Sequence, residues 1–245
     1  KTVIQLGNAF SSPPMNLDSS RYYNVFFDPH AGNFYYASSF EIFRPHGPSD
    51  SGKPLVMPKI FKFTPPEVDP ERGANFPSSL CFPTPGGDLL TSFLPQEPKA
   101  TTNRVVPHTT ALQSAILVAN ALTRTISLLM MSPNGSIHVN NCIEIIEDRS
   151  GTPNDGPFEE ASLSCPTHII EHKGGSYFVS DFEDGVSYIK YLNFKSRRLT
   201  TIVTGIAGPI SSLLSPSSSP SSLFIVAARR GILLKMKNQT GAKRA

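Results

Sequence analysis

The segment at 168–172 reads His-Ile-Ile-Glu-His and has the spacing of an inverted zinc-peptidase motif. Zinc binding by that motif requires a helix, which brings positions four apart onto one face. The β-branched pair at its centre and the Lys-Gly-Gly turn at 173–175 favour a strand instead. In a strand, Glu171 points away from both histidines. We therefore expect a structural or surface strand over 167–172, and not a peptidase.

Six further residues are candidates for a substrate-binding site, because they lie at or near the ends of predicted strands or among the aromatic residues that can line an apolar pocket. Where strands form a closed ring, their ends meet at one mouth of the central channel, and polar groups there can bind a substrate or an ion. The alternative is that polar residues of this kind only cap strands and hydrogen-bond turn backbone. The candidates are Asp181, Asn120, Asn140, Ser39, Tyr36 and Phe182. We expect no metal site, and Asp181 is the expected ligand if a divalent cation does bind. The catalytic residues stay unassigned.

Several other chemistries have no support in the sequence. No Gly-x-Ser-x-Gly, P-loop or Gly-x-Gly-x-x-Gly motif occurs, which argues against a nucleophile elbow and a phosphate loop. Cys81, Cys142 and Cys165 lack Cys-x-x-Cys spacing and permit one disulfide at most, whose pairing stays open. With a net charge of +3 and 17% charged residues, no nucleic-acid partner is expected. The longest apolar stretch, 111–131, is interrupted by polar residues, so we expect no membrane partner.

The elements that must position these residues are short strands, most clearly in the segment 176–190. Alternation places Tyr177 and Asp181 on one face, and the pair Asp184-Gly185 is a strong hairpin signal. Further strands are expected before it, over 167–172, and after it, over 199–204. Four antiparallel strands in about 40 residues match the size of one β-propeller blade.

The rest of the chain repeats this pattern at irregular spacing, which predicts an all-β fold: a single β-propeller domain of five or six four-stranded blades. Lys1–Leu6 is predicted to be a lone strand that closes the ring by pairing with the C-terminal blade. Strand 80–82 is expected to pair with a strand over 88–93. A helix is the competing interpretation of 111–131, but the flanking β-branched runs and turns favour strands there. The predicted units are a closing strand at 1–7 and blades at about 21–66, 76–107, 108–150, 160–205 and 209–245.

The segments Tyr177-Phe-Val-Ser-Asp181, Asp184-Gly185, Ile189 and Leu199-Thr-Thr-Ile202 resemble a blade of the NHL and SMP-30/gluconolactonase-like propeller superfamily. The best match spans residues 165–205. Metal-dependent members of that family hold a cation with a Glu, two Asn and an Asp, and Asp181 could match the Asp. The Glu-Gly-Pro and Arg-Phe-Asn-Asp-Gly segments of those members are missing here. The resemblance therefore favours the metal-free type that acts in natural-product pathways, such as hetero-Diels–Alderases.

These observations lead us to expect an enzyme that binds a small apolar organic substrate and promotes its cyclisation or cycloaddition by positioning, without a cofactor. One alternative is a lactonase of SMP-30 type that depends on a divalent cation. Another is a non-enzymatic protein-interaction propeller that uses loops 44–58 and 95–107. Acceptor patterns for N-glycosylation at Asn134 and Asn238 favour a secreted glycoprotein, and a chain that begins at Lys1 fits either a removed signal peptide or a trimmed sequence. We expect a monomer.

Overall fold

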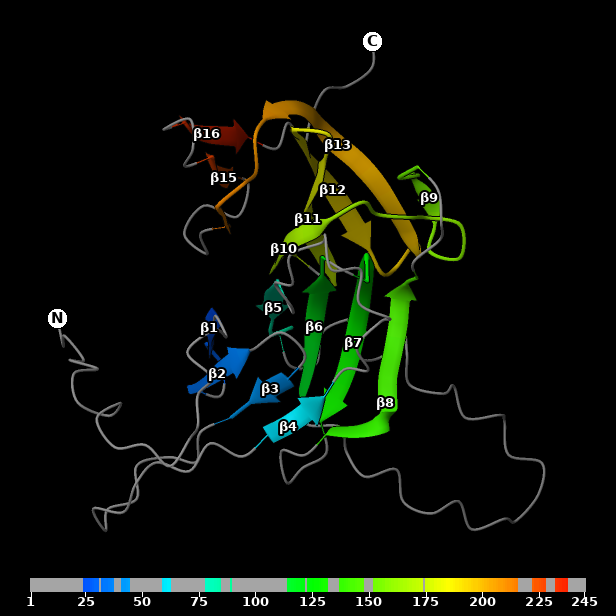
Figure 1. Ribbon diagram of the computed structural model, residues 1–245, viewed down its shortest axis with the longest axis vertical. Coiled ribbons are helices and arrows are strands. Elements are labelled where there is room, and N and C mark those ends of the chain that lie inside the picture. The colour runs from blue at the N-terminus through cyan, green and yellow to red at the C-terminus, as the bar shows by residue number, and fades with distance from the viewer. Residues whose placement is uncertain are drawn as a thin grey trace, which may run out of the picture.

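The computed structural model describes residues 24–30, 32–37, 41–44, 59–62, 78–84, 89, 114–121, 123–131, 137–147, 152–173, 175–215, 222–227 and 232–237. The elements that it bounds in these residues are β-strands, which form four antiparallel sheets (Figure 1). The described residues contain no helix that is long and apolar enough to cross a membrane.

The first two sheets have four strands each, and their order in space is their order along the chain. The first sheet consists of β1 (Asn24–Asp28), β2 (Asn33–Ala37), β3 (Glu41–Phe43) and β4 (Lys59–Lys62). The second consists of β5 (Ser79–Cys81), β6 (Ser114–Asn120), β7 (Thr125–Met131) and β8 (Ile137–Ile146). Consecutive residues of β6 and β7 are buried, so both faces of this sheet are covered by other layers.

The third sheet has five strands, and its last neighbour comes from upstream in the sequence. It consists, in spatial order, of β10 (Pro166–Glu171), β11 (Ser176–Glu183), β12 (Val186–Asn193), β13 (Arg198–Ala207) and the short β9 (Gly156–Pro157). The β11–β12 hairpin turns at Asp184 and Gly185, with φ of 48° and 83°, as a primed two-residue turn requires. The fourth sheet consists of β14 (Ser212–Leu214), β15 (Ser222–Ala227) and β16 (Ile232–Lys237).

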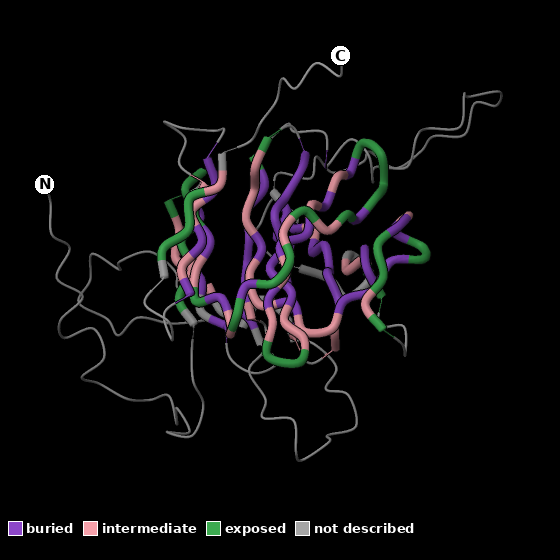
Figure 2. The backbone as a smooth tube through the Cα atoms, turned by 90° about the horizontal axis from the view of Figure 1, so that it is seen from above, coloured by how far each residue is buried: buried purple, intermediate pink, exposed green. Residues whose placement is uncertain are grey.

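Three apolar clusters fill the spaces between consecutive sheets, and the buried segments lie together in the interior (Figure 2). Alternation along one strand feeds two of these clusters: Leu117 packs toward the third sheet, whereas Ile116 packs toward the first. In the same way Tyr177 faces the second sheet and Phe178 faces the fourth. The first strands also meet, because β1 contacts β5, β5 contacts β10, and β10 contacts β14. Successive sheets therefore stack with their first strands adjacent.

Several predictions from the sequence are confirmed. The chain forms small antiparallel sheets, and 111–131 gives the strands β6 and β7 in place of the competing helix. Residues 167–171 of the predicted strand 167–172 lie in β10, and the hairpin turns where Asp184-Gly185 predicts it.

Two details of the predicted blades differ. β5 pairs with β6, and Leu89, the one described residue of 88–93, has helical backbone. β5 of the predicted unit 76–107 therefore lies in one sheet with β6, β7 and β8 of the predicted unit 108–150. The physical reason is that β6 is buried on both faces, so it needs a hydrogen-bonding neighbour on each side, and β5 and β7 supply them. The described strands form no closed ring, and the predicted closing strand at 1–7 lies outside the described residues.

Candidate functional site

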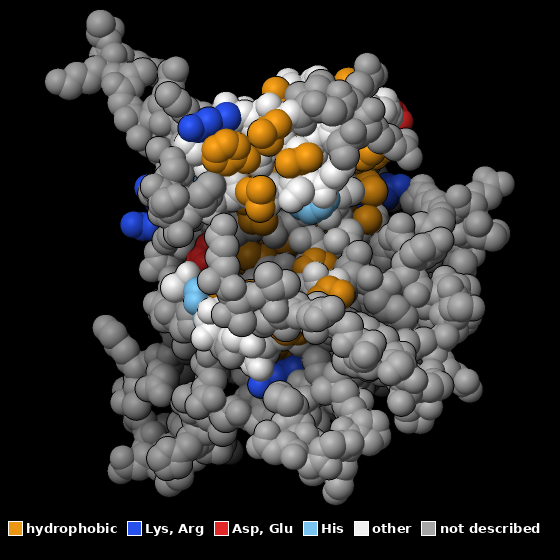
Figure 3. Space-filling view, turned by 90° about the vertical axis from the view of Figure 1, so that its left-hand side faces the viewer, with side chains coloured by type: hydrophobic (Ala, Val, Ile, Leu, Met, Phe, Trp, Pro, Cys, Tyr) orange, Lys and Arg blue, Asp and Glu red, His pale blue; other side chains and the backbone are white. Residues whose placement is uncertain are grey.

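A cleft of about 570 Å³ lies where the first strands of the four sheets come together, and we call it the central cleft. Its wall is largely apolar, with Phe27 on β1, Phe82 directly after β5 and Ile169 on β10. Ser215, directly after β14, lines it as well. Figure 3 shows the molecule from the side of β1, β15 and β16, where hydrophobic side chains gather on the surface. Pockets for small organic ligands occupy about 300–1,000 Å³, so the central cleft has a suitable size.

The main polar group of the central cleft is the carboxylate of Glu171. Its Oε2 accepts hydrogen bonds from the backbone N–H of Thr84 at 3.0 Å and from the Thr84 hydroxyl at 2.7 Å. These bonds join β10 to the segment after β5 and fix the carboxylate in one orientation. The predicted direction of Glu171 is confirmed, because His172 turns to the other face and its ring lies 4.6 Å from that of Phe178. The arrangement excludes the shared metal site that the spacing of this segment suggested.

Two buried polar atoms close to Glu171 have no hydrogen-bond partner among the described residues, namely Nδ1 of His172 and the hydroxyl of Tyr177. Burial and, secondarily, the nearby Lys173 lower the pKa of His172, so its imidazole is neutral near pH 7. Burial, followed by the charge of Glu171, raises the pKa of the Tyr177 hydroxyl far above its ordinary value. In the neutral imidazole one ring nitrogen donates and the other accepts a hydrogen bond, but the ring lies on the other face of the strand from Glu171.

Cys81 lines the central cleft but is not suited to nucleophilic chemistry. It is buried, and its burial together with the charge of Glu171 raises the pKa of the thiol well above its ordinary value. The thiolate is the reactive form, so Cys81 contributes an apolar surface instead. Cys81, Cys142 and Cys165 are all free thiols, and none of the disulfides that the sequence left open is present.

Asp181, the leading candidate from the sequence, is fully buried on β11 and lines neither this cleft nor the one described below. Its carboxylate accepts hydrogen bonds from the backbone N–H groups of Cys165, at 2.7 Å, and Ser164, at 3.1 Å. Burial raises the pKa of this carboxyl, although those two N–H groups act in the opposite direction. Asp181 thus holds the chain segment before β10 against the sheet, as the strand-capping alternative describes.

The other sequence candidates do not gather around one cavity. Asn120 is buried at the end of β6, where its Oδ1 has no partner among the described residues, and Phe182 is half-buried on β11. Neither lines the central cleft. Tyr36 lies on β2 opposite Val25, and Asn140 lies within β8, but their side chains are outside the description. Ser39, Asn134, Asn238 and nearly all of loops 44–58 and 95–107 lie outside the described residues.

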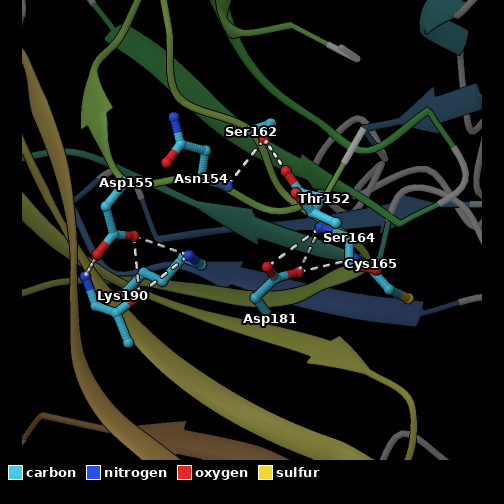
Figure 4. A network of polar contacts seen from close by, with 9 residues as sticks. Thr152, Asn154, Asp155, Ser162, Ser164, Cys165, Asp181 and Lys190 are labelled. Atoms are coloured by element: carbon cyan, nitrogen blue, oxygen red, sulfur yellow. Dashed lines mark hydrogen bonds and ion pairs between the residues drawn. The ribbon is translucent and has the colours of Figure 1, made fainter. Parts of the chain in front are cut away.

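A second polar cluster, not predicted from the sequence, lies over the third sheet (Figure 4). Lys190 on β12 is 3% exposed, and its ammonium donates to Oδ1 of Asp155 at 2.9 Å and to the Thr201 hydroxyl at 3.0 Å. Burial alone would raise the pKa of Asp155, but hydrogen bonds from the Thr201 backbone, Lys190 and the Thr201 hydroxyl lower it overall. This cluster borders a separate cleft of about 430 Å³, which we call the lateral cleft.

The sequence contains weak signals for the Lys190 cluster and for the Glu171 carboxylate. Lys190 falls on the same face of β12 as the buried Leu192, and a charged residue on a core-facing position needs a partner. Glu171 stands out in the sequence only as part of a zinc-peptidase motif. Neither alternation nor spacing could show that Thr84 and Asp155 supply the partners, since both contacts cross long stretches of chain.

Among the described residues, no three His, Cys, Asp or Glu side chains gather to hold a metal ion.

The chain matches no family model and no curated protein. It is similar to a solved structure, the crystal structure of a protein from Lactobacillus plantarum, with 13% sequence identity and a TM-score of 0.45. The match covers 91% of this chain and 58% of that one, so this chain spans less than two thirds of the other's length. A TM-score of this size does not establish a shared fold. The class that the structure defines is therefore an all-β protein of small antiparallel sheets.

Proposed function

We propose that this chain is a β-propeller-like protein that binds a small, largely apolar molecule in the central cleft and promotes its cyclisation or cycloaddition by positioning. The observation that carries the proposal is the composition of the central cleft. Apolar side chains from the first three sheets form a wall around one fixed carboxylate, Glu171, and Ser215 lines the cleft beside β14 of the fourth. Propeller blades are arranged with the first strand of each toward a common axis, which is consistent with the contacts among β1, β5, β10 and β14.

Each part of the cleft has a role in this proposal. The walls at Phe82 and Ile169 exclude water from the apolar part of the ligand and restrict its conformations. The carboxylate of Glu171 accepts a hydrogen bond from a hydroxyl or amine at the polar end of the ligand. Holding two reacting groups in an attack geometry can lower a barrier by about 7–11 kcal/mol in well-oriented cases. No nucleophile is required.

The first test is binding of the neutral fluorophore N-phenyl-1-naphthylamine. Thr84 is exposed and lines the central cleft, so Thr84→Trp fills the cleft without entering the core. Thr200→Trp is the matched control, since Thr200 is exposed on β13 and lines neither cleft. We expect saturable binding by the wild type and Thr200→Trp, and loss of binding by Thr84→Trp. Binding that Thr84→Trp leaves unchanged would overturn the location of the site.

The second test is the reaction itself. An ortho-quinone methide generated in solution is mixed with an olefin, and the cycloadduct is quantified with its stereoisomer ratio. The proposal expects a faster reaction and an altered ratio with the wild type, and neither with Thr84→Trp. A stereoisomer ratio identical to that in buffer, or lactone hydrolysis that requires calcium, would contradict the proposal.

A further inference from the structure

The lateral cleft is a second cavity that the proposed function does not use. It lies between the segment at 152–155 and the face of the third sheet formed by β12 and β13. Its lining includes Asp155, Glu183, Tyr188, Lys190, Thr201 and Thr204. None of these residues lines the central cleft.

Lys190 and Asp155 offer a donor and an acceptor side by side at this cleft. The ammonium has three protons, and two are used by Asp155 Oδ1 and by the Thr201 hydroxyl. Asp155 Oδ2 accepts one bond, from the Thr201 backbone N–H at 2.6 Å, and so retains a free lone pair. A ligand hydroxyl both donates and accepts a hydrogen bond, so this pair matches the hydroxyl groups of a polyol.

The charges at the lateral cleft disfavour an anionic ligand. Lys190 and Asp155 neutralise each other, and the carboxylate of Glu183 leaves the described lining with a surplus of one negative charge. A phosphate or carboxylate would be repelled by Glu183 and would compete with Asp155 for Lys190. A neutral ligand meets neither cost, and Glu183 can accept one of its hydroxyl protons.

Tyr188 adds the apolar component that a sugar ring requires. It projects from the same face of β12 as Lys190, half-buried, and it lines the cleft. An aromatic side chain of this kind combines a broad apolar body with a polar hydroxyl. A volume of about 430 Å³ lies within the range of small-ligand pockets.

The site is also held in place before any ligand arrives. Thr201 on β13 donates two hydrogen bonds to Asp155, one from its backbone N–H and one from its hydroxyl, and these bonds hold the carboxylate against β13. Asp181, on β11 of the same sheet, holds the segment before β10 by accepting hydrogen bonds from the backbone N–H groups of Ser164 and Cys165 (Figure 4). Preorganised hydrogen-bonding groups reduce the entropic cost of binding. We propose that the lateral cleft binds a neutral polyhydroxylated ligand of the pyranoside class through Lys190, Asp155 and Tyr188.

Saturation-transfer NMR with methyl pyranosides of glucose, mannose, galactose and N-acetylglucosamine tests this proposal on the full chain. Lys190→Met removes the donor, and Lys195→Met is the control, since Lys195 is exposed and lines neither cleft. We expect at least one pyranoside to bind, with affinity lowered about tenfold or more in Lys190→Met and unchanged in Lys195→Met. Tyr188→Ala tests the same site where Lys190→Met proves unstable, and it too should lower the affinity about tenfold or more.

Three results would overturn the proposal. The first is that none of the pyranosides binds at millimolar concentration, and the second is that binding is equal in all variants. Glu183→Gln supplies the third, since a neutral ligand should tolerate this substitution. Loss of binding in Glu183→Gln, together with binding of butylammonium by the wild type, would instead assign the cleft to an organic cation. Because the central cleft is not involved, Thr84→Trp should leave pyranoside binding intact.

Discussion

Removing the carboxylate of Asp155 should destabilise the protein more than removing the ammonium of Lys190. In Asp155→Ala the ammonium stays buried, at 4% side-chain exposure, without a charged partner. Breaking a buried ion pair in this way costs about 3–5 kcal/mol. The Asp155 side chain is 39% exposed, so water partly replaces it, and we expect a loss of about 2–3 kcal/mol in the free energy of unfolding.

The opposite substitution leaves a charge that water can still reach. In Lys190→Met the carboxylate of Asp155 keeps both hydrogen bonds from Thr201, and the apolar side chain fills the volume of the lysine stem. We therefore expect a cost of about 0–1 kcal/mol. The double variant should be more stable than Asp155→Ala alone, with a coupling energy of about 1–2 kcal/mol.

Urea unfolding measured by far-UV circular dichroism gives these free energies, with tyrosine fluorescence as a second probe because the chain has no tryptophan. The comparison uses midpoints and slopes together, since a change in slope would signal a loss of two-state behaviour. Additive losses in the double variant, or a larger cost for Lys190→Met than for Asp155→Ala, would refute the reasoning that burial of the lysine dominates.

Three further outcomes follow from the same structure. The hydrogen bonds that lower the pKa of Asp155 stabilise the fold at pH values above the ordinary aspartate pKa. This stabilisation is lost as the pH falls through the pKa that Asp155 has in the folded protein. The urea midpoints of Asp155→Ala should therefore fall less steeply with acid than those of the wild type. Gly185→Val should cost about 1–2 kcal/mol in urea unfolding, because φ is 83° there and valine is strained in that region, whereas Gly185→Asn should cost less. The native protein should react slowly with the thiol reagent DTNB, because burial raises the pKa of Cys81 and raises that of Cys142 to about 11. All three thiols should react at once in denaturant. Rapid reaction of Cys81 in the native protein would contradict its buried position.

The local parts of the fold could be predicted from the sequence, because their signals lie within a few residues of one another. Asp184-Gly185 fixes a hairpin, since both residues adopt positive φ, and alternation then assigns Tyr177 and Phe178 to opposite faces. The pairing of β5 with β6 could not be predicted in the same way. More than thirty residues separate the two strands, and nothing in 80–82 encodes which apolar strand will lie beside it.

The candidate site was less predictable, since a polar residue at a strand end has the same pattern whether it binds a ligand or holds backbone. Asp181 illustrates the difficulty. The sequence predicts a strand there and a polar group near its end, but the side chain is fully buried and accepts hydrogen bonds from the backbone N–H groups of Ser164 and Cys165. For Glu171 the sequence pattern suggests a zinc motif, whereas in the structure its carboxylate accepts a hydrogen bond from the Thr84 hydroxyl and lines the central cleft.

The third sheet contributes polar residues to both clefts, and these residues come from different strands. β10 contributes Glu171 to the central cleft, where an apolar wall surrounds one carboxylate, whereas β12 contributes Lys190 to the lateral cleft, where polar groups are already paired. The two environments favour different ligands, since the first gains from excluding water and the second gains from matched hydrogen bonds. β11 lies between β10 and β12 and carries Asp181, which fixes the segment leading into β10. A ligand in one cleft should therefore affect the other only through this rigid sheet, and variants that empty one site should leave binding at the other unchanged.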